Sequence, residues 1–318
     1  MSAVPPYRPQ QRSTPPECSS ALSLPPMPAA PPEPPSLSRD ALVAQLRDAG
    51  CVFAEDEAAL LLAAARDPAE LSAMAGRRAA GLPLEHVLGW AEFCGLRIVV
   101  EPGVFVPRRR SELLVRQAAS VTRPGALVVD LCCGSGALGA ALAAMVASRT
   151  QEDGEPGGAR LPGGRIELHA ADLDGAAVRC ARRNVAEAGG RVHEGDLFDA
   201  LPAGLLGRVA VLLANVPYVP TSSLGLLPAE ARVHEPRRAL DGGDDGLGVL
   251  RRVTAEAPRW LAPGGRLLTE TSEAQADAAA AVMENDGLAV RIDRCEESGA
   301  TVLTGTRPAA GTRPAPEA

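Results

Sequence analysis

The stretch "VVDLCCGSGALG", Val128 to Gly139, decides the fold. An aliphatic run ends at Asp130, and glycines follow in the pattern Gly134-x-Gly136-x-x-Gly139 before an alanine-rich run with helical character. A glycine-rich turn between a buried strand and a helix lets a ligand approach the backbone and directs free N–H groups at it. The stretch therefore predicts a strand, a ligand-binding turn and a helix.

Asp130 discriminates between the two cofactors that such a turn can bind. The glycine spacing alone also matches the dinucleotide fingerprint, in which a pyrophosphate lies at the helix N-terminus. A carboxylate at the end of the strand would repel a pyrophosphate and suits a cation, such as the amino group of a methionine moiety. S-adenosylmethionine is favoured over NAD, and a turn needed only for tight helix–sheet packing remains the alternative.

Acidic residues end two further predicted strands. "IELHAAD" ends at Asp172, which can accept both ribose hydroxyls of a bound nucleoside, whereas Asp174 suits the N-cap of the next helix. In "HEGDLF", Asp196 can accept the exocyclic amine of an adenine, while Leu197 and Phe198 line its faces. A solvated strand-end acid and an ordinary acidic turn are the respective alternatives.

The fourth motif is "LLANVPYVP", Leu212 to Pro220. The Asn215 side-chain oxygen and the Val216 carbonyl can accept the two protons of an amide or amino nitrogen, and Tyr218 can pack against its flat group. An aliphatic strand that simply stops at Pro217 is the structural alternative. At the carboxyl edge of an open α/β sheet, these residues would face the ligand crevice.

The chain divides by composition. Residues 1–37 are too rich in proline to bury much surface and are predicted to be disordered, and residues 38–89 form a small helical domain. Residues 90–306 form the main domain, with a flexible Gly-, Pro- and charge-rich insert at 147–165, and residues 307–318 are a disordered tail.

Within the main domain, apolar strands alternate with helices, which predicts a mostly parallel, doubly wound α/β sheet. The last two strand-like runs, 288–294 and 300–305, have no helix between them. They are expected to pair as an antiparallel hairpin at one edge, which is typical of a methyltransferase sheet and not of a plain dinucleotide fold.

Overall composition excludes some classes of function. The 318 residues carry a formal net charge of −7, which argues against broad nucleic-acid affinity. The seven cysteines are scattered, without C-x-x-C pairs or histidine partners, so they are expected to be reduced thiols with no metal site. There is no long charge-free apolar run, so no membrane association is expected and the predicted localisation is cytoplasmic.

Together these motifs resemble the protein-glutamine N5-methyltransferases that modify the Gly-Gly-Gln loop of class 1 peptide chain release factors. The likeness runs from about residue 77 to 305, and its most family-specific part is "EPRRALDGGDDG", Glu235 to Gly246. The resemblance implies a Rossmann-like class I methyltransferase sheet, preceded by a helical domain that helps to hold the release factor.

The resemblance also assigns residues. It implies S-adenosyl-L-methionine as the cofactor and a glutamine amide as the methyl acceptor. The implied cofactor-binding residues are Asp130, Cys132, Gly134, Gly136, Asp172, Asp196, Leu197 and Asn215, and the implied catalytic residues are Asn215, Val216, Pro217 and Tyr218.

Three positions depart from the family pattern. Val216 replaces the first proline of Asn-Pro-Pro-Tyr, Cys132 replaces a glycine, and Arg110 in "PRRRSE" replaces an acid. Two alternatives therefore stay open. One is amino-methylation of adenine or cytosine in nucleic acid, whose enzymes use a similar turn, and the other is a cofactor-binding relative without catalysis.

Overall fold

The computed structural model describes residues 37–152 and 165–309. The predicted disorder at the two ends falls almost entirely outside these ranges, as does most of the predicted insert. Helix α6 (Ala137–Glu152) nevertheless continues into residues expected to belong to the insert, because its alanine-rich sequence extends the helical pattern.

The first helices pack around their own apolar cluster. Ser38 caps α1 by accepting from the Ala41 N–H at 3.2 Å, and Leu42, Leu46 and Leu61 are fully buried. The buried Arg78 and Glu57 side chains form an ion pair at 2.6 Å. The helices are α1 (Arg39–Asp48), α2 (Ala54–Ala64), α3 (Pro68–Ala79) and α4 (Leu84–Leu88).

A short antiparallel hairpin follows the helices and was not predicted. It joins β1 (Trp90–Phe93) to β2 (Leu96–Val99) through Cys94 and Gly95. Both turn residues have positive φ, 51° and 74°, as a two-residue hairpin turn requires. The turn brings Phe93, which is completely buried, into the main core.

The main sheet has seven strands in the order β5-β4-β3-β6-β7-β9-β8. Neighbours from β5 to β7 are parallel, and β9 is antiparallel to both β7 and β8, so the predicted edge hairpin is confirmed. The strands are β3 (Leu127–Leu131), β4 (Glu167–Asp172), β5 (Arg191–Glu194), β6 (Val209–Ala214), β7 (Leu261–Thr271), β8 (Ala289–Cys295) and β9 (Ala300–Thr306).

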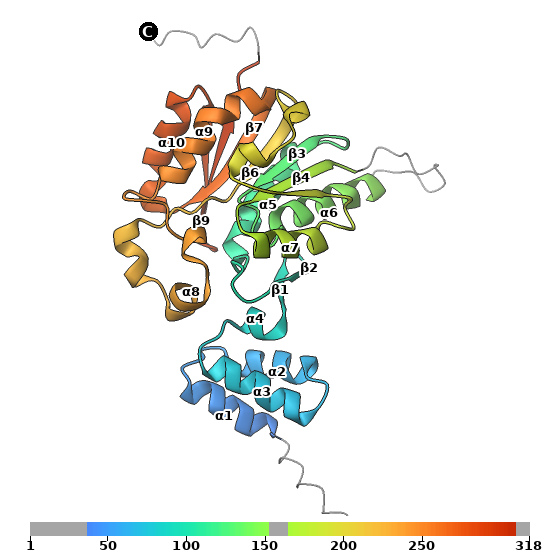
Figure 1. Ribbon diagram of the computed structural model, residues 1–318, viewed down its shortest axis with the longest axis vertical. Coiled ribbons are helices and arrows are strands. Elements are labelled where there is room, and N and C mark those ends of the chain that lie inside the picture. The colour runs from blue at the N-terminus through green and yellow to red at the C-terminus, as the bar shows by residue number, and fades with distance from the viewer. Residues whose placement is uncertain (1–36, 153–164, 310–318) are drawn as a thin grey trace, which may run out of the picture. The chain divides into compact units, whose positions relative to one another are not determined.

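Helices cover both faces of the sheet (Figure 1). Successive residues of β3 alternate between two cores: Val128 packs with one set of helices, and Val129 packs with the other. The predicted Rossmann-like, doubly wound methyltransferase sheet is therefore confirmed. The first core includes residues of α5 (Glu112–Val121), α6 and α7 (Gly175–Asn184), and the second includes residues of α9 (Gly248–Trp260) and α10 (Ala276–Asn285).

The strand order reverses between β3 and β6, because β4 and β5 lie on one side and β7 lies on the other. At such a switch point the loops that leave the two central strands diverge and open a crevice at their carboxyl ends. Helix α8 (Ala229–His234) lies in the long connection from β6 to α9. In the described parts of the chain no helix is long and apolar enough to cross a membrane.

Candidate active site

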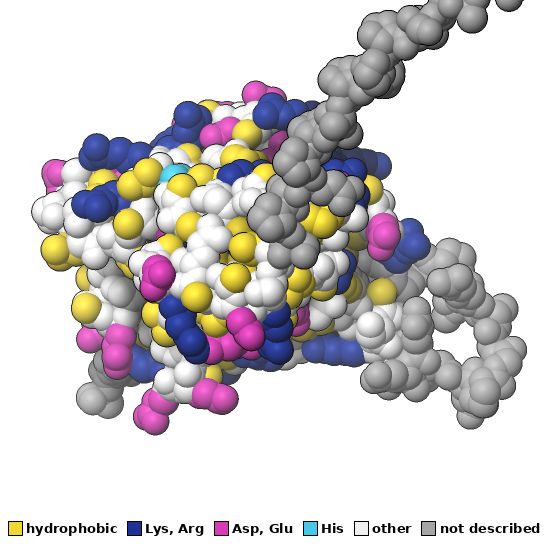
Figure 2. All heavy atoms as spheres, turned by 90° about the horizontal axis from the view of Figure 1, so that it is seen from below, with side chains coloured by type: hydrophobic (Ala, Val, Ile, Leu, Met, Phe, Trp, Pro, Cys, Tyr) yellow, Lys and Arg dark blue, Asp and Glu magenta, His cyan; other side chains and the backbone are white. Residues whose placement is uncertain are grey.

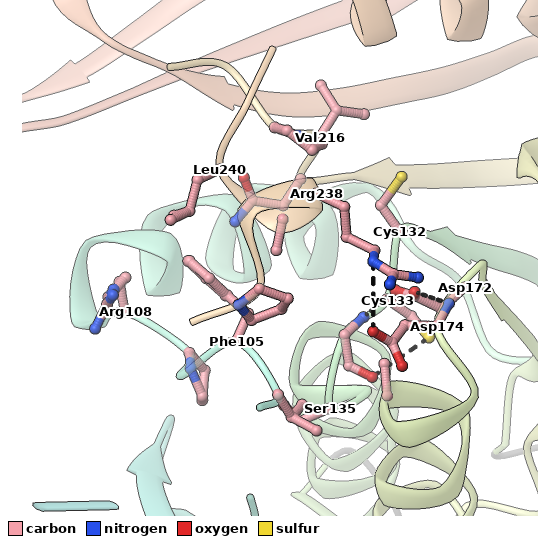
Figure 3. A pocket seen from close by; sticks show the side chains of 18 of the residues that line it. Phe105, Arg108, Cys132, Cys133, Ser135, Asp172, Asp174, Val216, Arg238 and Leu240 are labelled. Carbon is pink, nitrogen blue, oxygen red and sulfur yellow. Dashed lines mark hydrogen bonds and ion pairs between the residues drawn. The ribbon is translucent and has the colours of Figure 1, made fainter. Parts of the chain in front are cut away.

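A cavity of about 590 Å³ lies at the carboxyl ends of the central strands. Its walls include the segments that follow β3, β4 and β5 and the long connection between β6 and α9 (Figure 3). The predicted site residues that line it are Cys132, Gly134, Asp172, Asp196, Leu197, Asn215, Val216, Pro217 and Tyr218.

Two predicted cofactor residues, Asp130 and Gly136, do not line the cavity. Gly136 has φ +77°, and a β-carbon there would lie 3.1 Å from the Ala181 α-carbon, so it serves the close approach of the turn to α7. The Asp130 carboxylate is buried beneath the turn and accepts from the Gly139 N–H at 3.0 Å. Burial raises the pKa of Asp130 to about 7.

The second oxygen of Asp130, Oδ1, is buried and has no hydrogen-bond partner among the described residues. An unpaired buried carboxylate oxygen is costly, and positive charge near the turn would favour its ionised form. This chemistry fits the ammonium and sulfonium groups of S-adenosylmethionine better than it fits a pyrophosphate.

Cys132 takes a backbone conformation that favours glycine. Its φ is +53°, in the left-handed region, and this costs a side-chain-bearing residue about 1 to 2 kcal/mol. Burial, together with the nearby Asp172 and Asp130 carboxylates, raises the pKa of the Cys132 thiol far above its usual range. Cys132 therefore stays protonated and is a wall of the cavity, not a nucleophile.

Asp172 ties the glycine turn to the end of β4. Its Oδ2 accepts from the Gly134 N–H at 2.8 Å, and its Oδ1 accepts from the Asp174 N–H at 2.8 Å. A carboxylate has about four acceptor sites, so two remain for hydroxyl donors. Asp174 accepts from the Ala176 N–H at 2.8 Å, which confirms its predicted role as the N-cap of α7.

Asp196 and Leu197 form the next part of the wall. Arg252 donates to Asp196 Oδ2 at 2.7 Å across an exposed ion pair. An adenine amine would have to share this carboxylate with Arg252 or displace it. Leu197 has φ +47°, and it packs partly against the core on the α9 face while lining the cavity.

Asn215 and Tyr218 line the cavity from the segment that follows β6. The Asn215 amide nitrogen donates to the Ser111 hydroxyl at 3.4 Å, and the Tyr218 hydroxyl donates to Glu270 at 3.1 Å. The Arg110 guanidinium hydrogen-bonds Tyr218 Oη and lies 5.8 Å from the ring centroid. Burial and the Glu270 carboxylate raise the pKa of the Tyr218 phenol above its usual range, so it stays protonated.

Sequence reasoning did not assign Ser111 and Glu270 to the site and noted Arg110 only as a departure. The signal for Glu270 was available, because "GRLLTE" is an apolar strand ending in an acid, as "IELHAAD" is. Ser111 and Arg110 carry no comparable signal, since they begin a helix far from β7 in sequence.

The Glu235 to Gly246 block supports the Asn215–Tyr218 loop through backbone hydrogen bonds. The Val219 N–H donates to the Leu240 carbonyl at 3.0 Å, and the Gly242 N–H donates to the Val219 carbonyl at 2.8 Å. The backbone carbonyl of Tyr218, one residue earlier, accepts from the Gln275 side-chain amide at 3.0 Å. The Glu235 to Gly246 block thus fixes the position of the chain that follows β6.

The same block reaches both ends of the cavity. The nearly inaccessible Glu235 carboxylate accepts from Arg108 at 2.6 and 2.7 Å. Arg238 extends toward the glycine turn and approaches Asp174 at 3.7 Å (Figure 3). Within residues 37–152 and 165–309, no group of His, Cys, Asp and Glu has the arrangement of a metal site.

Two curated proteins similar to this chain are release factor glutamine methyltransferases. No protein-family model matches the chain. A release factor glutamine methyltransferase from Geobacter sulfurreducens is 36% identical over 226 residues, which are 70% of this chain and 72% of that protein. One from Bordetella pertussis is 34% identical over 257 residues, covering 78% of this chain and 88% of that protein.

A relative that is named for a different substrate is also similar. The 4-amino-L-phenylalanine/4-methylamino-L-phenylalanine methyltransferase of Streptomyces pristinaespiralis is 38% identical over 201 residues. The match covers 61% of this chain and 62% of that protein.

Proposed function

Because this chain belongs to the release factor glutamine methyltransferase family, we propose that its cavity is the site at which a glutamine side-chain amide is methylated. The acceptor is the glutamine of the Gly-Gly-Gln loop of a class 1 peptide chain release factor. The observation that carries the proposal is the Asn215 to Tyr218 loop, which lines the cavity together with Asp172 and the glycine turn.

The loop from Asn215 to Tyr218, the acceptor loop, provides the hydrogen-bond acceptors that an amide nitrogen requires. An amide nitrogen is a poor nucleophile because its lone pair is delocalised into the carbonyl. The Asn215 side-chain oxygen and the Val216 carbonyl accept its two protons, which fixes its orientation and eases the charge that develops on it. The Tyr218 ring packs against the flat amide plane.

S-adenosylmethionine supplies an electrophilic methyl group when it is bound. Asp172 would hold its ribose hydroxyls, the Gly134 turn its methionine end, and Asp196 with Leu197 its adenine. These assignments fit the residues present, since Asp172 has spare acceptor capacity and Asp130 Oδ1 has no hydrogen-bond partner in the described part of the chain.

No strong base is needed before the methyl group moves. Tyr218 and Cys132 are both protonated, and neither is suited to remove a proton. The amide nitrogen would take the methyl group that S-adenosylmethionine supplies, with S-adenosylhomocysteine as the leaving group, and would then lose its proton to water. Most of the acceleration comes from alignment, for which effective molarities allow about 7–11 kcal/mol.

A protein substrate fits the surroundings of the cavity. Leu226 and Val233 are 86% and 65% exposed, and they flank lining residues such as Leu227 and Ala231. Exposed apolar side chains beside an active site suit contact with a folded partner. On the face shown in Figure 2, which is the molecule seen from below, basic and acidic side chains are intermixed and form no continuous basic surface of the kind that binds a nucleic acid backbone.

The test is methyl transfer to an unmodified class 1 release factor by the purified chain, read by intact mass and then located by fragmentation. One methyl group on the Gly-Gly-Gln glutamine is the expected result. A release factor whose glutamine is replaced by asparagine is the matched control, and transfer to it would contradict the proposed acceptor.

A second candidate is methylation of the amino group of a free aromatic amino acid. It is favoured by the 38% identity to the Streptomyces pristinaespiralis enzyme and by Val216, which replaces a proline of the release factor pattern. Incubation with 4-amino-L-phenylalanine in place of the release factor separates the two candidates. Methylation of the small amine alone would favour the second.

A further inference from the structure

The buried Glu270 carboxylate accepts hydrogen bonds from three side chains, and we call this cluster of Glu270, Arg110, Ser111 and Tyr218 the Glu270 hub. Its carboxylate, 2% exposed, lies near the carboxyl end of β7. Oε2 accepts from the Ser111 hydroxyl at 2.6 Å, and Oε1 accepts from Arg110 Nε at 2.8 Å and from the Tyr218 hydroxyl at 3.1 Å. None of these three donors is adjacent to Glu270 in sequence, so the fold itself builds the hub.

The hydrogen-bond chemistry of this hub determines which way the Asn215 amide points. The Glu270 carboxylate pairs with the Arg110 guanidinium at 2.8 Å and acts as the hydrogen-bond acceptor for Arg110 and for Ser111. Ser111 has one hydroxyl proton, and its 2.6 Å bond to Glu270 uses it. The Ser111 oxygen is then left to accept from Asn215, so the amide nitrogen of Asn215 turns toward Ser111.

The opposite end of the amide is the oxygen that the reaction needs. With Nδ2 committed to Ser111, Oδ1 is left for the proton of the acceptor nitrogen. The reversed amide would present two donors to a substrate that also presents two donors. Asn215 would then form no hydrogen bond to the acceptor nitrogen, which would be held by the Val216 carbonyl alone and would lose its fixed orientation.

We propose that Ser111 and Glu270 are positioning residues that set the orientation of the Asn215 amide through the relay Glu270–Ser111–Asn215. The inference rests on the proposed function, since it concerns the same acceptor site. Glu270 also fixes Tyr218 directly and through Arg110, so both acceptor-facing side chains are oriented by one carboxylate.

The first test compares Ser111→Ala with Ser111→Thr, which keeps the hydroxyl. Ser111→Ala should lower kcat roughly threefold to tenfold, the effect of one neutral hydrogen bond, while the Kd for S-adenosylhomocysteine stays unchanged. Ser111→Thr should restore kcat. Ser120→Ala is the matched control, because the exposed Ser120, in the helix α5 that follows Ser111, donates its hydroxyl to the Gln117 carbonyl at 2.7 Å.

A double-mutant cycle separates positioning from a general structural role. If Ser111 acts through Asn215, Ser111→Ala should have no further effect on single-turnover rate once Asn215→Ala is present. The same loss of rate in both backgrounds would overturn the relay, because Ser111 would then act independently of Asn215.

A spectroscopic readout tests the relay independently of the proposed function. The two side-chain amide protons of Asn215, identified in ¹⁵N-labelled protein by their loss in Asn215→Ala, should exchange faster with water in Ser111→Ala and slowly again in Ser111→Thr. That result with a wild type that does not methylate the release factor would refute the proposed substrate and keep the relay. Unchanged exchange in Ser111→Ala would overturn the relay even if the wild type is active.

Discussion

A β-carbon added to Gly242 would lie 2.7 Å from the carbonyl oxygen of Pro217. It would also lie 2.5 Å from the Gly246 carbonyl oxygen, so two backbone segments pack directly against Gly242. Neither contact can relax through a flexible side chain. The Glu235 to Gly246 block can therefore support the acceptor loop only if position 242 has no side chain.

Gly242→Ala should shift the acceptor loop and lower both stability and turnover. Forcing one methyl group into a packed site costs about 1 to 3 kcal/mol, which urea denaturation would measure. Gly225→Ala is the matched control, because a β-carbon there meets nothing within 4 Å. Equal behaviour of the two variants would show that the close approach to Pro217 does not constrain the loop.

Asn215→Ala should abolish useful turnover and leave the cofactor site intact. Removing one polar group that contacts the transition state lowers kcat by about 10²–10³. The Kd for S-adenosylhomocysteine, measured by calorimetry, should remain within a few-fold of the wild type. Wild-type turnover in this variant would remove Asn215 from the acceptor site.

Asp172→Ala should have the opposite effect, weakening the cofactor. The variant loses the acceptor for ribose hydroxyls and also the bond that ties the Gly134 N–H to the end of β4. Calorimetric titration should show weaker binding of both S-adenosylmethionine and its demethylated product. Asp199→Ala, in the 3-10 turn after Asp196 and outside the cavity lining, is the control, and equal affinities in the two variants would refute the assignment.

Asp130→Asn should change how stability depends on pH. Burial raises the Asp130 pKa from 3.8 to about 7, so between these values the folded protein binds more protons than the unfolded chain. The contribution of Asp130 is therefore fully present below its unfolded pKa and is lost as pH rises through the folded pKa. Asn keeps an acceptor for the Gly139 N–H and does not titrate.

Relative to wild type, Asp130→Asn should gain stability between about pH 4 and about pH 7, with no further change above that. Urea denaturation of both proteins across this range gives the difference, in which the other titrating groups cancel. A difference that does not vary with pH would mean that Asp130 titrates normally in the folded protein.

The strand ends were predictable from sequence because each couples an apolar run to a polar residue. Asp172 and Asn215 end runs that only a buried strand explains, and parallel strands carry their ends to one edge. The Cys94–Gly95 hairpin was missed because its two strands have only four residues each, too few for a clear alternation.

The roles of individual residues in the glycine turn were harder to predict from the sequence. Gly134 and Gly136 have the same sequence signal, yet one lines the cavity and the other packs on α7. A glycine needed for a ligand and a glycine needed for a helix look alike until the neighbouring helix is placed. The relay of Ser111, Glu270 and Asn215 was equally inaccessible, because it joins three segments that only the tertiary fold brings together.

The most direct measurement is the mass of an unmodified class 1 release factor after incubation with this chain and S-adenosylmethionine, with the Asn215→Ala variant run in parallel. We predict one added methyl group, located on the Gly-Gly-Gln glutamine, with the wild type and almost none with the variant. An unmodified release factor, under conditions in which calorimetry shows that the wild type binds S-adenosylmethionine, would contradict the proposed substrate.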